Sequence, residues 1–217
     1  MDPREAPAYD IAEAAHYLRL PKSTLGNWVR GHKTFKPVLK TPTDRHTLSF
    51  INLVEAHMLW AITRHHHIPL QKVRRALRYL TQQFRDPHPL ANVPLETDKI
   101  NLLVQVMGKT INASEEGQVV MREVVEASLR RIERGVKDDP IVLYPFVTSD
   151  VANERKTVMF NPSVAFGRLV LVGTGIPTTE VAQRYKAGES ITELADDYER
   201  SAIEIEDAIR FELPEAA

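Results

Sequence analysis

Five residues near the amino terminus recur at the spacing of one helical face, and their side chains are of the kinds that contact nucleic acid. They are Lys22, Ser23, Gly26, Asn27 and Arg30. Positions three or four apart share a helical face. Lysine and arginine neutralise phosphates, whereas serine and asparagine hydrogen-bond to base edges in the major groove. The pattern therefore predicts a short helix that contacts DNA.

The flanking sequence supplies the elements that would position this face. Leu25, Trp28 and Val29 fall on the opposite side and give the helix an apolar back. Residues 10–18 form an earlier amphipathic run, and Leu20-Pro21 separates the two runs. The order predicts two packed helices joined by a tight turn. An ordinary helical hairpin without DNA contact is the alternative.

The next segment predicts a basic hairpin, or wing. Two β-capable runs, residues 35–40 and 47–50, flank Pro42-Thr43-Asp44-Arg45, which is rich in turn formers. A basic hairpin beside a basic helix favours phosphate contact. The predicted DNA-binding residues are Lys22, Ser23, Asn27, Arg30, Lys33, Lys36, Lys40 and Arg45.

Charge is divided unevenly along the chain. The net charge of the 217 residues is −1. Residues 1–85 contain 14 lysines and arginines against 6 acids, whereas residues 86–217 contain 14 against 23. Such asymmetry indicates a nucleic-acid-binding part joined to a part with another role. A solvated charged surface is the alternative explanation.

Two more helices are predicted after the wing. Ser49 can cap a helix over residues 50–65, and Pro69 can open a second that runs to about residue 84. His65-His66-His67 lies between them. Adjacent histidines cannot all reach one ion from a regular element, and the chain has no cysteine. We therefore expect no metal site, no disulfide and no cofactor.

The middle of the chain carries no chemical motif. Residues 85–93 predict a linker, residues 100–107 and 118–121 a small sheet, and residues 123–134 an amphipathic helix. The sequence contains no phosphate-binding loop, nucleophile elbow or His–Glu metal pair. We expect no catalytic residue and no enzyme, and we assign this region to scaffold, dimerisation or partner binding.

The carboxyl-terminal residues predict three short helices. Gly173, Gly175 and Pro177 shape a turn into a helix over residues 178–186. Ser190 with Glu193 forms a capping box for the second helix, and a serine at 201 caps the third. Residues 178–215 hold 4 basic against 11 acidic side chains, which would repel phosphate. A protein is the more favourable partner for this module.

The amino-terminal part resembles the MerR-like winged-helix family. That family usually has arginine and an aromatic residue where this chain has Gly26 and Asn27, so its base-reading rules do not transfer. Because one short helix reads few base pairs, we expect a homodimer on a palindromic or pseudo-palindromic operator DNA site. The resemblance is carried by Asp10-Ile11-Ala12-Glu13-Ala14-Ala15, by Thr24-Leu25 with Trp28 and Gly31, and by Leu48-Ser49-Phe50.

The last fifty-odd residues resemble the family called domain of unknown function 433. The matching runs are Asn161-Pro162-Ser163-Val164-Ala165-Phe166-Gly167-Arg168, Gly173-Thr174-Gly175-Ile176-Pro177-Thr178, Tyr185-Lys186-Ala187-Gly188-Glu189-Ser190-Ile191, Glu193-Leu194-Ala195-Asp196-Asp197-Tyr198 and Ile205-Glu206-Asp207-Ala208-Ile209-Arg210.

Such a tail on a MerR-like head resembles a VapB-type antitoxin. The resemblance implies a PIN-type ribonuclease toxin as partner, silenced by the carboxyl-terminal module, and an operon repressed by the amino-terminal part. Arg168 and Arg200 lie near turns and could reach the carboxylates of the nuclease, and Tyr185 and Tyr198 could mask its site.

We expect a mainly α fold with small β elements, of the α+β class. Residues 1–85 form the winged helix-turn-helix, residues 86–160 a sheet-plus-helix region and residues 161–213 a three-helix module. No apolar run approaches the roughly 20 residues of a membrane span, and we expect a cytoplasmic protein without a membrane partner. The alternative is a stand-alone, ligand-responsive regulator of the MerR-like class, with its effector pocket in the middle region.

Overall fold

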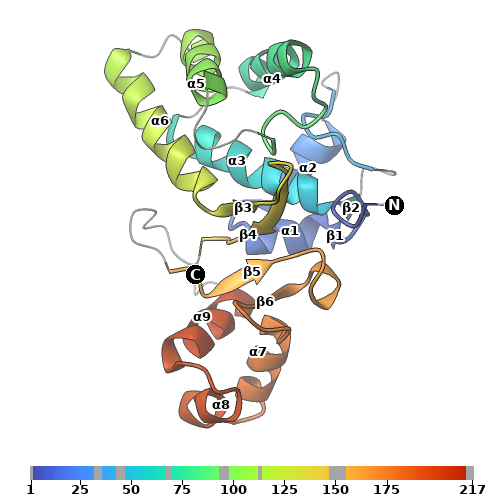
Figure 1. Cartoon of the computed structure of the whole chain (residues 1–217), viewed down its shortest axis with the longest axis vertical. Helices are drawn as coiled ribbons and strands as arrows, with labels where there is room; N and C mark the ends of the chain where they lie inside the picture. The colour runs from blue at the N-terminus through green and yellow to red at the C-terminus, as the bar shows by residue number, and fades with distance from the viewer. Residues whose placement is uncertain are drawn as a thin grey trace. The chain divides into compact units, whose positions relative to one another are not determined.

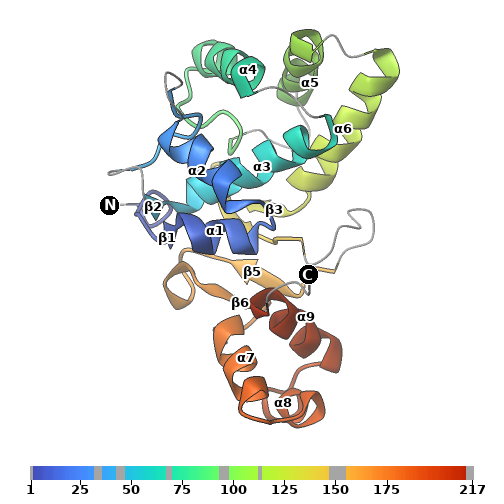
Figure 2. The same ribbon diagram turned by 180° about the vertical axis from the view of Figure 1, so that it is seen from behind.

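The computed structural model describes residues 2–31, 36–42, 47–66, 70–92, 98–111, 114–146 and 155–213. The chain divides into two compact units, residues 1–141 and residues 142–217 (Figures 1 and 2). Most elements are helices, and the sheets are small and antiparallel. The predicted mainly α, α+β class is confirmed. The three-part division of the chain at residues 85 and 160 stays a prediction.

The first unit begins with the predicted helix pair. Strand β1 (Tyr9–Asp10) leads into α1 (Ile11–Tyr17), and α2 (Lys22–Arg30) follows after a short turn. Strand β2 (Thr47–Leu48) returns to pair antiparallel with β1. The two helices pack on each other. Their predicted positions in the chain are confirmed.

Helix α3 (Phe50–His66) forms the centre of the first unit's core. Leu53, Met58 and Leu59 on this helix have no exposed surface. The predicted cap is present, since Ser49 Oγ accepts a hydrogen bond from the backbone N–H of Asn52 at 3.3 Å. Helix α4 (Leu70–Phe84) follows. The side chains of the histidine triplet lie outside the described residues, and so does Pro69.

The sheet predicted from residues 100–107 and 118–121 is wrong, because both runs are helical. They belong to α5 (Asp98–Ile111) and α6 (Glu115–Leu129). Helix α5 packs between α4 and α6, and α6 packs on α3. The reason is visible in the buried set, which follows the helical spacing i, i+3, i+4, i+7: Ile100, Leu103, Val104 and Met107.

The helix predicted over residues 123–134 is also too long. It ends at Leu129, and residues 132–134 form strand β3 (Ile132–Arg134), which leads into β4 (Pro140–Leu143). The predicted linker is held against the core rather than free of it. Glu55 accepts a hydrogen bond from His88 Nδ1 at 2.9 Å, and Arg134 Nη2 donates to the Ala91 carbonyl at 2.8 Å.

The second unit is a small antiparallel sheet with three helices. Strands β4, β5 (Val158–Phe160) and β6 (Leu169–Leu171) are adjacent in that order. Between β5 and β6 lies the short turn η1 (Ala165–Gly167). Helices α7 (Thr178–Lys186) and α8 (Ile191–Asp197) both pack against α9 (Ala202–Glu212).

The predicted caps of this module are confirmed. Ser190 with Glu193 and Ser201 with Glu204 each form a complete capping box. Residues 147–154, between β4 and β5, lie outside the described residues.

Candidate nucleic-acid interface

The turn between α1 and α2 fixes how the second helix is presented. Asp10 caps α1, and its Oδ1 accepts from the backbone N–H groups of Ala12 and Glu13 at 2.7 and 2.8 Å. After α1, Arg19 takes a positive φ of 50° and Leu20 is buried. Pro21 then starts α2, where its missing N–H costs no intrahelical bond.

Helix α2 is amphipathic in the predicted sense. Leu25 and Val29 have no exposed surface, and Trp28 lies 6.5 Å from the ring of Trp60 on α3. The predicted contact residues on the other face are all exposed: Lys22, Ser23, Asn27 and Arg30. Lys22 and Arg30 make no ion pair with any described residue. The cations of this face are therefore available to a phosphate.

Gly26 lies on the same face, and the fold gives no reason for it. A Cβ built at this position would have no atom within 4 Å. Glycine in a helix costs roughly 1 kcal/mol relative to alanine. The protein itself therefore leaves room for a side chain at the centre of its presented helix.

The predicted wing is not found where the structure describes the segment. Residues 36–42 contain no strand, and β2 pairs with β1 instead. The backbone N–H groups of Val38 and Leu39 donate to the Trp28 carbonyl at 2.8 and 3.1 Å, which ties this segment to the end of α2. Lys33 and Arg45 lie outside the described residues.

Lys36 and Lys40 line a groove that the sequence analysis did not predict. Its volume is about 440 Å³, and Arg74 and Arg78 of α4 supply two further cations. The Arg74 Nε–H donates to the Lys36 carbonyl at 2.7 Å, so the helix positions the segment. Burial lowers the pKa of the Arg74 guanidinium. The i, i+4 spacing of Arg74 and Arg78 can be read from the sequence. The contact between Arg74 and Lys36 cannot, because the two residues are 38 positions apart.

The residues predicted to contact a toxin have different environments. Arg168 is exposed, and Tyr185 is 39% exposed. Tyr198 is half-buried, with the Arg184 guanidinium 4.9 Å above its ring.

Arg200 does not project freely, contrary to expectation. Its Nη2 donates to the Val172 carbonyl and to Glu204, the latter at 2.8 Å. The contact with Val172 spans 28 residues, so neighbouring sequence could not reveal it.

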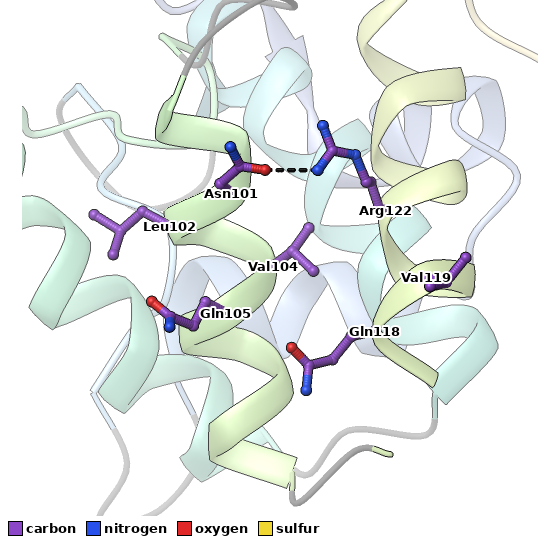
Figure 3. Close-up of a pocket in the computed structure, with 7 residues that line it drawn as sticks. All are labelled: Asn101, Leu102, Val104, Gln105, Gln118, Val119 and Arg122. Carbon is purple, nitrogen blue, oxygen red and sulfur yellow. Dashed lines mark hydrogen bonds between the residues drawn. The ribbon is translucent and has the colours of Figure 1, made fainter. Parts of the chain in front are cut away.

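A second groove, of about 510 Å³, separates α5 from α6 (Figure 3). Three amide side chains, those of Asn101, Gln105 and Gln118, line it together with aliphatic groups. Arg122 reaches across from α6 and donates to Asn101 Oδ1 at 2.6 Å. In the described part of the chain, no three His, Asp or Glu side chains are grouped so as to hold a metal ion. No described helix is both long and apolar enough to span a bilayer.

Two family models match the chain, one in each of its two compact units. Residues 7–77 match the family model described as Putative DNA-binding HTH domain, and residues 158–211 match Protein of unknown function (DUF433). The chain is 26% identical to Putative antitoxin VapB45 of Mycobacterium tuberculosis, over 94% of this chain and 93% of the relative. It is 26% identical to Uncharacterized protein Rv2308 of the same organism, over 94% and 89%.

A solved structure shows the same fold. The crystal structure of Rv2018 from Mycobacterium tuberculosis superposes with a TM-score of 0.71 at 24% identity, covering 94% of this chain and 98% of that one. The chain thus matches a helix-turn-helix model in its amino-terminal part and the DUF433 model in its carboxyl-terminal part, and it is similar over its length to a protein named as an antitoxin.

Proposed function

We propose that this protein is the antitoxin of a type II toxin–antitoxin pair and not an enzyme. Its first unit binds operator DNA and represses its own operon, and its second unit binds and inhibits a PIN-type ribonuclease. The observation that carries the DNA-binding part is the exposed face of α2, whose cations Lys22 and Arg30 have no acidic partner among the described residues. The match of residues 7–77 to a helix-turn-helix model supports it.

The basic groove extends this face. Lys36, Lys40, Arg74 and Arg78 line one hollow, and phosphate neutralisation supplies much of the affinity of DNA-binding proteins. We assign this groove to the DNA backbone and the face of α2 to base edges, acting as a wing and a recognition helix. A homodimer would place two such helices on one palindromic site.

The toxin-binding part rests on the similarity to an antitoxin and on charge. Residues 178–215 hold 11 acidic against 4 basic side chains, which excludes a phosphate backbone as a favourable partner. A protein surface fits this module better.

The DNA assignment is tested by replacing Lys22, Asn27 and Arg30 together by alanine. Operator affinity, measured by fluorescence anisotropy, should fall at least about 100-fold, since each good base or phosphate contact is worth roughly 1–3 kcal/mol. The matched control replaces Lys137, Gln183 and Lys186, which removes the same charges and one amide from exposed positions elsewhere. Equal loss in both variants, or none in the first, would contradict the assignment.

The toxin assignment is tested by co-expression with the product of the adjacent open reading frame, which the proposal expects to be a nuclease. The two proteins should purify as a complex without ribonuclease activity, and activity should appear when the complex is dissociated. A nuclease that stays active in the presence of this protein would refute this part of the proposal.

A stand-alone ligand-responsive regulator is the second candidate. The groove between α5 and α6 favours it, since amide side chains and Arg122 offer both donors and acceptors to a small polar effector. Enlarging Val104 to phenylalanine would place a bulky ring in this groove. If operator affinity responds to a metabolite extract in the wild type but not in this variant, the regulator is favoured over the antitoxin.

A further inference from the structure

The turn between β5 and β6 holds three successive residues with positive φ. The values are 46° for Ala165, 58° for Phe166 and 79° for Gly167. Only Gly167 adopts this backbone conformation without cost. For Ala165 and Phe166, which have L side chains, it costs roughly 1–2 kcal/mol of conformational energy each. Two backbone hydrogen bonds hold the turn, from Gly167 N–H to the Val164 carbonyl at 2.9 Å and from Arg168 N–H to the Ala165 carbonyl at 3.2 Å.

This strained turn presents an aromatic ring to solvent. Phe166 is 91% exposed, whereas Val164 and Ala165 pack against a buried cluster on the sheet: Val142, Tyr144, Met159 and Val170. These two neighbours therefore anchor the turn, and the ring of Phe166 is left exposed to solvent. An exposed phenylalanine forgoes roughly 1.5–3 kcal/mol of burial. Backbone strain and exposure at one residue together suggest a role in binding, because such strain gathers at functional sites.

Arg168 lies next to this ring in the chain and is also exposed. It makes no ion pair or side-chain hydrogen bond with the described residues. Other arginines of the second unit are engaged, Arg184 with Glu189 and Asp197, and Arg200 with Glu204. Arginine is enriched at protein–protein hot spots, and phenylalanine is among the aromatic residues enriched in interfaces.

Charge within the second unit narrows the class of partner. Residues 142–217 contain 13 acidic against 7 basic side chains, so nucleic acid and anionic lipid are repelled. Two copies of the unit would repel each other for the same reason. Figures 1 and 2 show the β5–β6 connection at the opposite end of the unit from α8, where Asp196 and Asp197 lie, so a carboxylate can approach Arg168 there.

We infer that Phe166 and Arg168 form the anchor by which the second unit binds its nuclease, an inference that rests on the proposed function. Phe166 enters an apolar pocket on the nuclease surface, and Arg168 pairs with a carboxylate at the rim of that pocket. The strained turn supplies rigidity, because a ring held in one place loses little entropy on binding.

The test exploits the strain. Phe166→Asn and Phe166→Gly both suit a positive φ, so the melting temperature of the full chain should stay the same or rise. Affinity for the nuclease that the proposed function names as partner, measured by calorimetry, should fall at least about 30-fold, the loss expected of a hot spot. Arg168→Ala should cost about tenfold, and Arg168→Lys should restore only part of it.

Matched controls separate anchoring from mere exposure. Val136→Asn removes a fully exposed apolar side chain from the first unit, and Lys186→Ala removes an exposed cation from the second. Both variants should bind the nuclease as the wild type does.

The outcomes are distinct. If the wild type binds the nuclease and both Phe166 variants bind equally well, the anchor is refuted and the proposed function stands. If the wild type does not bind, the proposed function fails with it. If Phe166→Asn instead turns a dimer into a monomer in sedimentation, the residue serves self-association and the inference is overturned.

Discussion

Helices α2 and α7 are built on the same local plan but differ in how their cations are paired. Each begins directly after a proline without a side-chain cap, and each is followed by a glycine of positive φ, Gly31 at 79° and Gly188 at 107°. On α2 the exposed cations have no acidic partner among the described residues. On α7 the main cation, Arg184, pairs with Glu189 and Asp197, and these partners raise its pKa. The other cation of α7, Lys186, is exposed like those of α2. The two helices therefore differ in the pairing of one arginine and not in the sign of their charge.

The largest expected effect concerns how DNA affinity depends on salt concentration. Replacing Lys36 and Lys40 by alanine should weaken binding to every DNA sequence by about 30-fold at physiological salt, and should lower the slope of log affinity against log salt by roughly 2. The reason is that two phosphates would lose their neutralising partners. Titrations between 50 and 300 mM salt would measure it. An unchanged slope would remove the groove from the interface.

The two units should also differ in how their stability falls as the pH is lowered. Burial lowers the pKa of His57 to about 4, while its Nε2–H donates to the Ser128 carbonyl at 3.2 Å. The unfolded chain binds this proton near pH 6.5, so the stability that the neutral ring provides is present above pH 6.5 and is lost as pH falls toward 4. Between pH 7 and pH 5 the wild type should lose about 2 kcal/mol more than His57→Gln.

Tryptophan fluorescence makes this measurement specific to the first unit, because Trp28 and Trp60 are the two tryptophans of the chain. Residues 142–217 contain no histidine. The second unit depends instead on carboxylates such as Glu193, whose pKa is lowered by hydrogen bonds from Ser190, and their contribution is lost only below about pH 4.5. Equal acid sensitivity of fluorescence in wild type and variant would contradict the role of His57.

Removing the amino-terminal cap of α9 should lower the stability of the fold and leave DNA binding unchanged. Ser201 Oγ accepts from the Glu204 N–H at 3.3 Å, and Glu204 accepts in return from the Ser201 N–H at 3.0 Å. Ser201→Ala should therefore cost about 1 kcal/mol of unfolding free energy. Operator affinity should remain that of the wild type. A large loss of affinity would mean that the second unit takes part in DNA binding.

The smallest expected effect is that of Gly26→Ala, which should raise the stability of the fold and lower operator affinity. Gly26→Ala should stabilise α2 by up to about 1 kcal/mol, since nothing in the protein lies where the new Cβ would be. If the backbone approaches DNA closely at this point, operator affinity should fall several-fold at the same time. Ser23→Ala serves as the control for a small change on the same face. Higher stability with unchanged affinity would show that the glycine has no part in binding.

Local signals in the sequence predicted much of the fold. Pro21, Ser190 and Ser201 mark helix starts through interactions within a few residues, and each of these starts is found in the structure. The apolar run at residues 100–107 could not be resolved in the same way, since it suits a strand as well as a buried helix, and packing against α4 and α6 decides between them.

The sites show the same limit. The face of α2 could be predicted because one helix contains it. The cationic groove joins Lys36 to Arg74 across 38 residues, and Arg200 bonds to Val172 across 28, so both depend on the tertiary fold. Phe166 carried no signal at all, because positive φ and exposure are properties of the folded turn.

Asp10 illustrates how mutational surveys of this protein can mislead. It is exposed and ends strand β1 where α1 begins, and its carboxylate caps the first turn of α1. In a library selected for repression, serine, threonine, asparagine and to a lesser degree glycine should replace it. That narrow tolerance at a surface position beside the helices proposed to bind DNA would resemble the signature of a contact residue, although the side chain is occupied with its own backbone.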